Sequence, residues 1–120
     1  MAISAPTRLD PDFWGSLDRL VAENHLVIDR PKGSRHPRYP DVIYPLDYGY
    51  LESTTTADGG GLDIWVGSLP QKKLTALVLT VDLHKQDIEI KLLLGCTEVE
   101  QQQILNFLNS GLMCAARILR

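Results

Sequence analysis

The stretch that decides the fold is Tyr44-Pro-Leu-Asp-Tyr-Gly-Tyr-Leu51, followed by the acidic turn Asp58-Gly-Gly-Gly-Leu-Asp63 and the apolar run Ile64-Trp65-Val66. Three glycines let the backbone reverse, which would bring the carboxylates of Asp58 and Asp63 to one edge. Carboxylate oxygens are ligands that Mg²⁺ prefers. The turn therefore predicts a cation site, although taken alone it favours the simpler interpretation of an ordinary Asp-Gly hairpin.

Composition and charge exclude several classes of protein. A chain of 120 residues predicts one domain over 1–120, with 1–9 as a loose N-terminus. The net charge of −3 gives no general attraction to nucleic acid or anionic lipid. No apolar run approaches the roughly 20 residues that span a bilayer, and the N-terminus lacks the pattern of a secretory signal. We expect a soluble, cytoplasmic protein with no membrane partner.

Helices and strands are predicted from caps and periodicity. Asp10 and Pro11 precede apolar residues at helical spacing, and Thr97 with Glu100 forms the pattern of a capping box. Two apolar runs on either side of Asp82-Leu-His-Lys-Gln-Asp87 predict a hairpin. The expected elements are a helix over 11–23, a strand over 26–28, strands over 75–81 and 88–94, a helix that begins near 98, and a closing strand over 112–119.

Four carboxylates are expected at one end of the sheet. The hairpin would hold Asp82 and Asp87 close together, and the glycine turn would do the same for Asp58 and Asp63. If both loops lie at the same end, these groups would repel one another unless cations lie between them.

The segment from Arg30 to Pro40 is a cationic loop that contains Lys32, Arg35 and Arg38. Binding of an anion and simple solvation explain such a loop about equally well. Nucleic acid is not favoured as a partner, because it usually needs a broad basic surface or aromatic stacking platforms.

Other reactive residue types show no pattern of a site. His25, His36 and His84 have no spacing typical of a zinc site or a catalytic triad, so solvated imidazoles are expected. Cys96 and Cys114 lie in apolar surroundings and predict core packing.

From Val27 to Leu94 the chain resembles the soluble family I inorganic pyrophosphatases. Val27-Ile-Asp29-Arg-Pro31 is similar to an acidic strand of the family that ends in proline, and Arg38-Tyr39 to its phosphate-contacting pair. Tyr44 to Tyr50 resembles the signature Tyr-Pro-x-Asn-Tyr-Gly-Phe/Tyr, and Asp58 to Asp63 falls on Asp-x-Asp-Pro-x-Asp.

This resemblance implies an α+β, mainly β fold, an OB-like five-stranded barrel with flanking N- and C-terminal helices. It also implies Mg²⁺ as cofactor, with Mn²⁺ as a substitute, and a homo-oligomer. Asp58, Asp63 and Tyr48 would be catalytic. The expected metal ligands are Asp29, Asp58, Asp63, Asp82 and Asp87, and the expected phosphate contacts are Arg38, Tyr48, Lys32, Arg35 and Lys91.

The chain departs from the family at several of these positions. Gly60 replaces the aspartate expected to act as general base, and Glu89 replaces a phosphate-binding lysine, with Lys91 two residues later on the same strand face. Hydrolysis of inorganic diphosphate, or of a small diphosphate-containing molecule, is therefore expected at a reduced rate. The alternative is a catalytically inactive binding or regulatory module for phosphate-bearing ligands.

Overall fold

Eight elements follow one another in the computed structural model, which describes residues 10–120; the expected loose terminus, 1–9, lies outside the described residues. They are α1 (Pro11–Glu23), β1 (Leu26–Arg30), β2 (Asp47–Leu51), β3 (Leu62–Val66), β4 (Leu74–Asp82), β5 (Asp87–Leu94), α2 (Glu98–Leu108) and β6 (Met113–Leu119). The predicted helices and the closing strand are confirmed.

The six strands form one mixed sheet in the order β1-β2-β3-β5-β4-β6. Each neighbouring pair is antiparallel except β3 and β5, which run parallel. The α+β class is confirmed. The sheet differs from the expected barrel because it has six strands, and within residues 10–120 its edge strands β1 and β6 do not pair to close it.

Local capping fixes where both helices begin. The Asp10 carboxylate accepts a hydrogen bond from the Phe13 N–H at 2.8 Å, and Pro11 occupies the first turn of α1. In α2 the Thr97 hydroxyl accepts from the Glu100 N–H at 3.1 Å, while the Glu100 carboxylate accepts from the Thr97 N–H at 2.8 Å. These short-range bonds explain why the sequence predicts both helices correctly.

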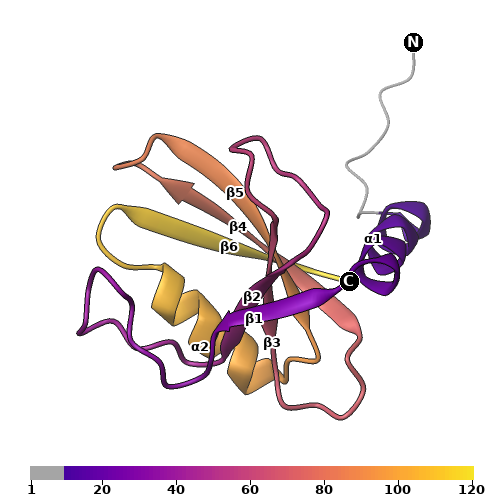
Figure 1. Ribbon diagram of the computed structural model, residues 1–120, viewed down its shortest axis with the longest axis horizontal. Coiled ribbons are helices and arrows are strands. Elements are labelled where there is room, and N and C mark those ends of the chain that lie inside the picture. The colour runs from indigo at the N-terminus through magenta and orange to yellow at the C-terminus, as the bar shows by residue number, and fades with distance from the viewer. Residues whose placement is uncertain (1–9) are drawn as a thin grey trace.

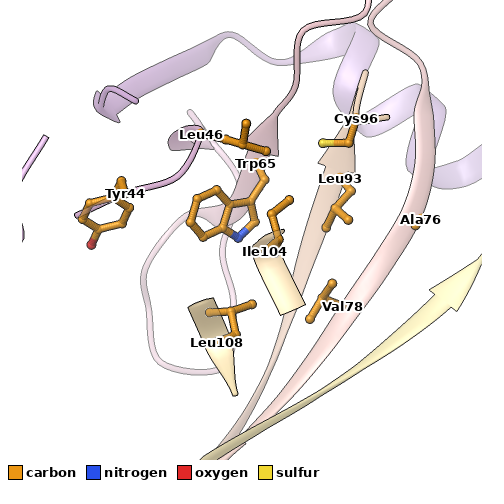
Figure 2. Packing of buried hydrophobic residues seen from close by; sticks show 9 residues of the cluster. All are labelled: Tyr44, Leu46, Trp65, Ala76, Val78, Leu93, Cys96, Ile104 and Leu108. Atoms are coloured by element: carbon orange, nitrogen blue, oxygen red, sulfur yellow. The ribbon is translucent and has the colours of Figure 1, made fainter. Parts of the chain in front are cut away.

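The two helices cover opposite faces of the sheet (Figure 1). On one face Trp14 of α1 packs in a cluster with Leu51, Ile64 and Leu92. On the other face Trp65 of β3 packs against α2, and Figure 2 shows its indole ring beside Ile104. The described part of the chain contains no helix long and apolar enough to cross a membrane.

Strands β1 and β2 approach one another very closely at Gly49. A Cβ atom at this position would overlap the carbonyl oxygen of Val27, so only glycine fits there without a shift of the backbone. The close pairing holds β2 in place, and β2 in turn carries Tyr48 onto the face covered by α2.

Candidate functional site

A cavity of about 860 Å³ lies on the α2 face of the sheet. It is bounded by strands β2 to β5, the end of α2 and the loop around Tyr39. We call it the site cavity. Its polar wall is formed by Tyr48, Asp58, Asp63, Asp82, Glu89 and Lys91, and further lining residues include His36, Tyr39, Tyr44, Trp65, His84, Lys85 and Phe107.

Strand register brings the polar residues together. Asp63 lies opposite Tyr50 on β2 and opposite Lys91 on β5, while Trp65 lies opposite Tyr48. Side chains that alternate along a strand share a face, so Asp63 and Trp65 point to the same side of the sheet. On this face of the sheet, the residues around Trp65 therefore form an aromatic core, and the residues around Asp63 form a charged cavity wall.

Lys91 is the centre of the charged wall. Its ammonium nitrogen lies 3.1 Å from Asp63 Oδ2, 3.0 Å from Glu89 Oε2 and 3.1 Å from the Tyr48 hydroxyl. The Lys91 side chain is only 6% exposed, against 31% for Asp63 and 26% for Glu89. Burial alone would lower the pKa of Lys91, but the Tyr48 oxygen and the two carboxylates hold that pKa above its ordinary value.

Tyr48 is kept as a neutral phenol. Burial raises the pKa of its hydroxyl, and this effect exceeds the opposing attraction of the Lys91 ammonium. The Tyr48 oxygen accepts a hydrogen bond from Lys91, and its own O–H interacts with the Asp63 carboxylate, which further raises the pKa of Tyr48.

Asp58 is fixed by its own turn. Oδ1 accepts hydrogen bonds from the Thr56 hydroxyl and from the Gly60 N–H, the latter at 2.9 Å. These bonds lower the pKa of Asp58, the Thr56 bond having the larger effect. Gly59, at φ +85°, provides the left-handed residue that the turn requires.

Asp82 is fixed in the same way at the start of the β4–β5 hairpin. Its Oδ1 accepts from the backbone N–H groups of Lys85 at 3.0 Å and His84 at 2.9 Å. These bonds lower the pKa of Asp82, with the Lys85 N–H as the main cause. Asp87 lies opposite Asp82 in the ladder, as expected from the hairpin, but it lines a neighbouring cavity of about 340 Å³ that also contains Asp58 and Asp63.

A resident Mg²⁺ ion fits this arrangement poorly. Carboxylates are suitable ligands for the ion, yet within residues 10–120 no three acidic, histidine or cysteine side chains are grouped closely enough to hold a metal. Moreover, the Lys91 ammonium already lies between Asp63 and Glu89. The roles predicted for Asp58, Asp63, Asp82 and Asp87 as metal ligands stay predictions.

The remaining predicted residues lie away from the cavity wall. Asp29 is an exposed residue of β1, and Lys32 and Arg38 are exposed in the loop that follows. The Arg35 guanidinium donates to the Pro40 carbonyl at 2.9 Å. Among these cations Arg38 is the best placed to reach a ligand in the site cavity, because its neighbours His36 and Tyr39 line that cavity.

Several lining residues were not among the predicted site residues. His36 stacks on Tyr44, with ring centroids 6.3 Å apart, and burial and nearby cations lower its pKa. His84 and Lys85 are contributed by the loop between Asp82 and Asp87. Their position between two predicted ligands was the available signal, since a loop that carries a ligand at each end presents its intervening side chains to the same region.

Comparison with known proteins shows similarity at the level of structure. No protein-family profile matches the sequence, and no curated protein matches it. An inorganic pyrophosphatase from Neisseria gonorrhoeae superimposes with a TM-score of 0.63 at 15% identity, over 78% of this chain and 80% of the other. The chain has a pyrophosphatase-like fold.

Two further solved structures agree. The inorganic pyrophosphatase of Helicobacter pylori gives a TM-score of 0.57 at 14% identity, over 79% of this chain and 83% of its own. That of Coxiella burnetii gives 0.56 at 14% identity, over 78% and 82%. At this level of identity the similarity concerns the fold, and the chemistry has to be argued from the residues of the site cavity.

Proposed function

We propose that the chain binds inorganic diphosphate, or a small molecule with a diphosphate group, as its magnesium complex in the site cavity and hydrolyses it slowly. The observation that carries this proposal is the meeting of Asp58, Asp63 and Asp82, from three separate segments, in one cavity. The pyrophosphatase-like fold supports the same substrate class.

The charge of the cavity favours a ligand that brings its own cations. Four carboxylates line it, against the two lysines Lys85 and Lys91. A bare diphosphate would be repelled, whereas a magnesium complex offers positive charge to the carboxylate oxygens. Asp58 and Asp82 each use Oδ1 in the hydrogen bonds of their turns, so Oδ2 can face the complex. Magnesium carried by the substrate would neutralise charge on the transferring phosphoryl group.

The protein side chains would orient the diphosphate. The neutral Tyr48 hydroxyl can donate to a phosphate oxygen in place of Asp63, whose carboxylate is held beside it through Lys91. On the rim, Lys85, His84 and His36 can contact phosphate oxygens. Arg38, Arg35 and Lys32 remain proposed contacts from the neighbouring loop, where exposed cations can meet the outer phosphate.

A reduced rate follows from Gly60. This residue has no side chain to accept the proton of the attacking water, and loss of a general base commonly lowers a rate by about 10² to 10⁴. The substrate and the fixed hydrogen-bond donors would still supply positioning and charge neutralisation.

The test is release of phosphate from diphosphate in the presence of Mg²⁺. We expect release by the wild-type chain that is lost with Asp58→Asn or Asp63→Asn and with a chelator. Asp12→Asn, which removes a carboxylate from α1 on the opposite face of the sheet, should leave the rate unchanged. Equal release by all four proteins would refute the proposal.

A binding module without hydrolysis is the second candidate. Gly60 favours it, as does the Lys91 ammonium that already bridges Asp63 and Glu89. Calorimetric titration with magnesium diphosphate separates the two candidates, since binding without phosphate release would identify a module. A cytoplasmic location and a homo-oligomer remain predictions. For the homo-oligomer, the exposed side chains of Val81, Ile88 and Ile90 offer an apolar contact face.

A further inference from the structure

Lys91 has no free N–H group to offer an incoming ligand. A protonated lysine carries three N–H donors and no acceptor. In this chain the three acceptors within hydrogen-bond distance are Asp63 Oδ2, Glu89 Oε2 and the Tyr48 oxygen, all at 3.0 to 3.1 Å. The ammonium is therefore saturated by the protein itself.

The surroundings hold this ammonium in place. Lys91 belongs to the central strand β5, with Asp63 opposite it on β3 and Val78 opposite it on β4. Its nitrogen also lies 5.4 Å from the centre of the Tyr48 ring, within the range of a cation–π contact. A lysine that is 6% exposed and bonded in this way is fixed by packing on both sides.

A positive charge is needed at this position. Glu89 and Asp63 both direct an oxygen at the same point, and two carboxylates so close would repel one another without a cation between them. Mg²⁺ is commonly held by one or two carboxylates together with water. The ammonium satisfies the same two oxygens from within the chain.

We infer that Lys91 is a built-in counter-ion that takes the place of a divalent cation between Asp63 and Glu89, so that removing its ammonium creates a divalent metal site at this pair of carboxylates. This role replaces the direct phosphate contact expected for Lys91. The inference does not depend on hydrolysis, because it concerns only which cation neutralises Asp63 and Glu89.

The test is a titration with Mn²⁺ alone, without diphosphate, in which free Mn²⁺ is followed by electron paramagnetic resonance. We expect Lys91→Met to bind one ion at least tenfold more tightly than the wild type. Lys85→Met is the matched control, because it removes the same charge from the same cavity and leaves the ammonium between Asp63 and Glu89. Its affinity should change less than threefold.

Three results of the titration would overturn the inference. These are an unchanged affinity in folded Lys91→Met, an equal gain in Lys85→Met, and tight Mn²⁺ binding by the wild type that Glu89→Gln weakens. If Lys91→Met does not fold in the absence of metal, Mn²⁺ should restore its circular dichroism spectrum. Failure to restore it would also count against the built-in counter-ion. Lys91→Met combined with Glu89→Gln should bind no more tightly than the wild type.

Discussion

Gly60 is the position at which a single substitution should raise the rate of the proposed diphosphate hydrolysis. An ideal Cβ built there has the Asp58 Oδ1 atom as its nearest neighbour, at 3.3 Å, so a side chain fits with a shift of a few tenths of an ångström. Unlike Gly59, Gly60 does not lie in the left-handed region, and substitution carries no backbone penalty of that kind. Gly60→Asp would therefore place a carboxylate beside Asp58 at the edge of the site cavity.

The expected gain is that of a general base, about 10²-fold in kcat at the lower end of the usual range. At 1.36 kcal/mol per factor of ten, this lowers the barrier by about 2.7 kcal/mol. The lower end is appropriate because the neighbouring Asp58 carboxylate raises the pKa of the new acid and restricts its position. Below that pKa the gain should disappear, because the protonated acid cannot accept a proton from water.

The assay is phosphate release at saturating magnesium diphosphate, measured for the wild type, Gly60→Asp and Gly60→Asn. Asparagine has nearly the same size as aspartate but no basic oxygen, so it isolates the effect of the base. Thermal unfolding should place all three proteins within a few degrees of one another, as expected for an exposed turn. Equal kcat for the two variants, with substrate binding retained, would refute the reasoning.

Three further predictions concern stability. Tyr48→Phe removes the oxygen 3.1 Å from the Lys91 nitrogen and should lower the free energy of unfolding in urea by about 1 kcal/mol; no loss would contradict the bond. Thr97→Ala breaks the capping box and should cost about 1 kcal/mol, whereas Thr97→Ser should cost much less in the same assay. Folding raises the pKa of Lys91. The protonated side chain therefore stabilises the folded state fully below the unfolded-state pKa of 10.5, and this stabilisation is lost as pH rises through the folded-state pKa. The difference in unfolding free energy between wild type and Lys91→Met should stay constant from about pH 7 to 10 and narrow above that range; a difference that widens there would contradict this.

The helices could be predicted because their signals are local. Asp10 lies three residues from the N–H that it caps, and Thr97 and Glu100 bond to one another within one turn. Strand β6 was predicted as well, but its pairing with β4 was not, because pairing depends on residues far away in the sequence. This pairing places β6 at an edge of the open sheet and leaves Cys114 exposed, so its predicted core position is wrong, whereas Cys96 is buried as expected.

Strand β5 shows a second limit of periodicity. Its first half alternates, which predicts a strand but does not say which face is covered. In the structure Ile88 is 71% exposed, whereas Lys91 on the other face is buried. The polar face of β5 is the one that the site cavity and α2 cover. The sequence pattern of a strand does not say on which face a helix will pack, so this could not be predicted.

The sequence predicts four aspartates at one end of the sheet. Three of them, Asp58, Asp63 and Asp82, line one cavity, whereas Asp87 lines the neighbouring one, and their roles as ligands stay predictions. The contact of Lys91 with Asp63 was not predicted, because it requires the parallel register of β3 and β5, which no local signal specifies. The sequence favours the loop arginines as phosphate contacts, whereas His36 and Lys85 line the cavity directly.

The parallel ladder between β3 and β5 joins two halves of the sheet, β1-β2-β3 and β5-β4-β6. Each half is built from antiparallel ladders of its own, so the β3–β5 ladder is the one that depends on both halves, and long-range contacts of this kind slow folding. Asp63 and Lys91 face one another across this seam. The Asp63–Lys91 pair therefore forms in the same step as the contact between the two halves. Two fragments of the chain, cut between Val66 and Leu74, should form this pair only when they are mixed.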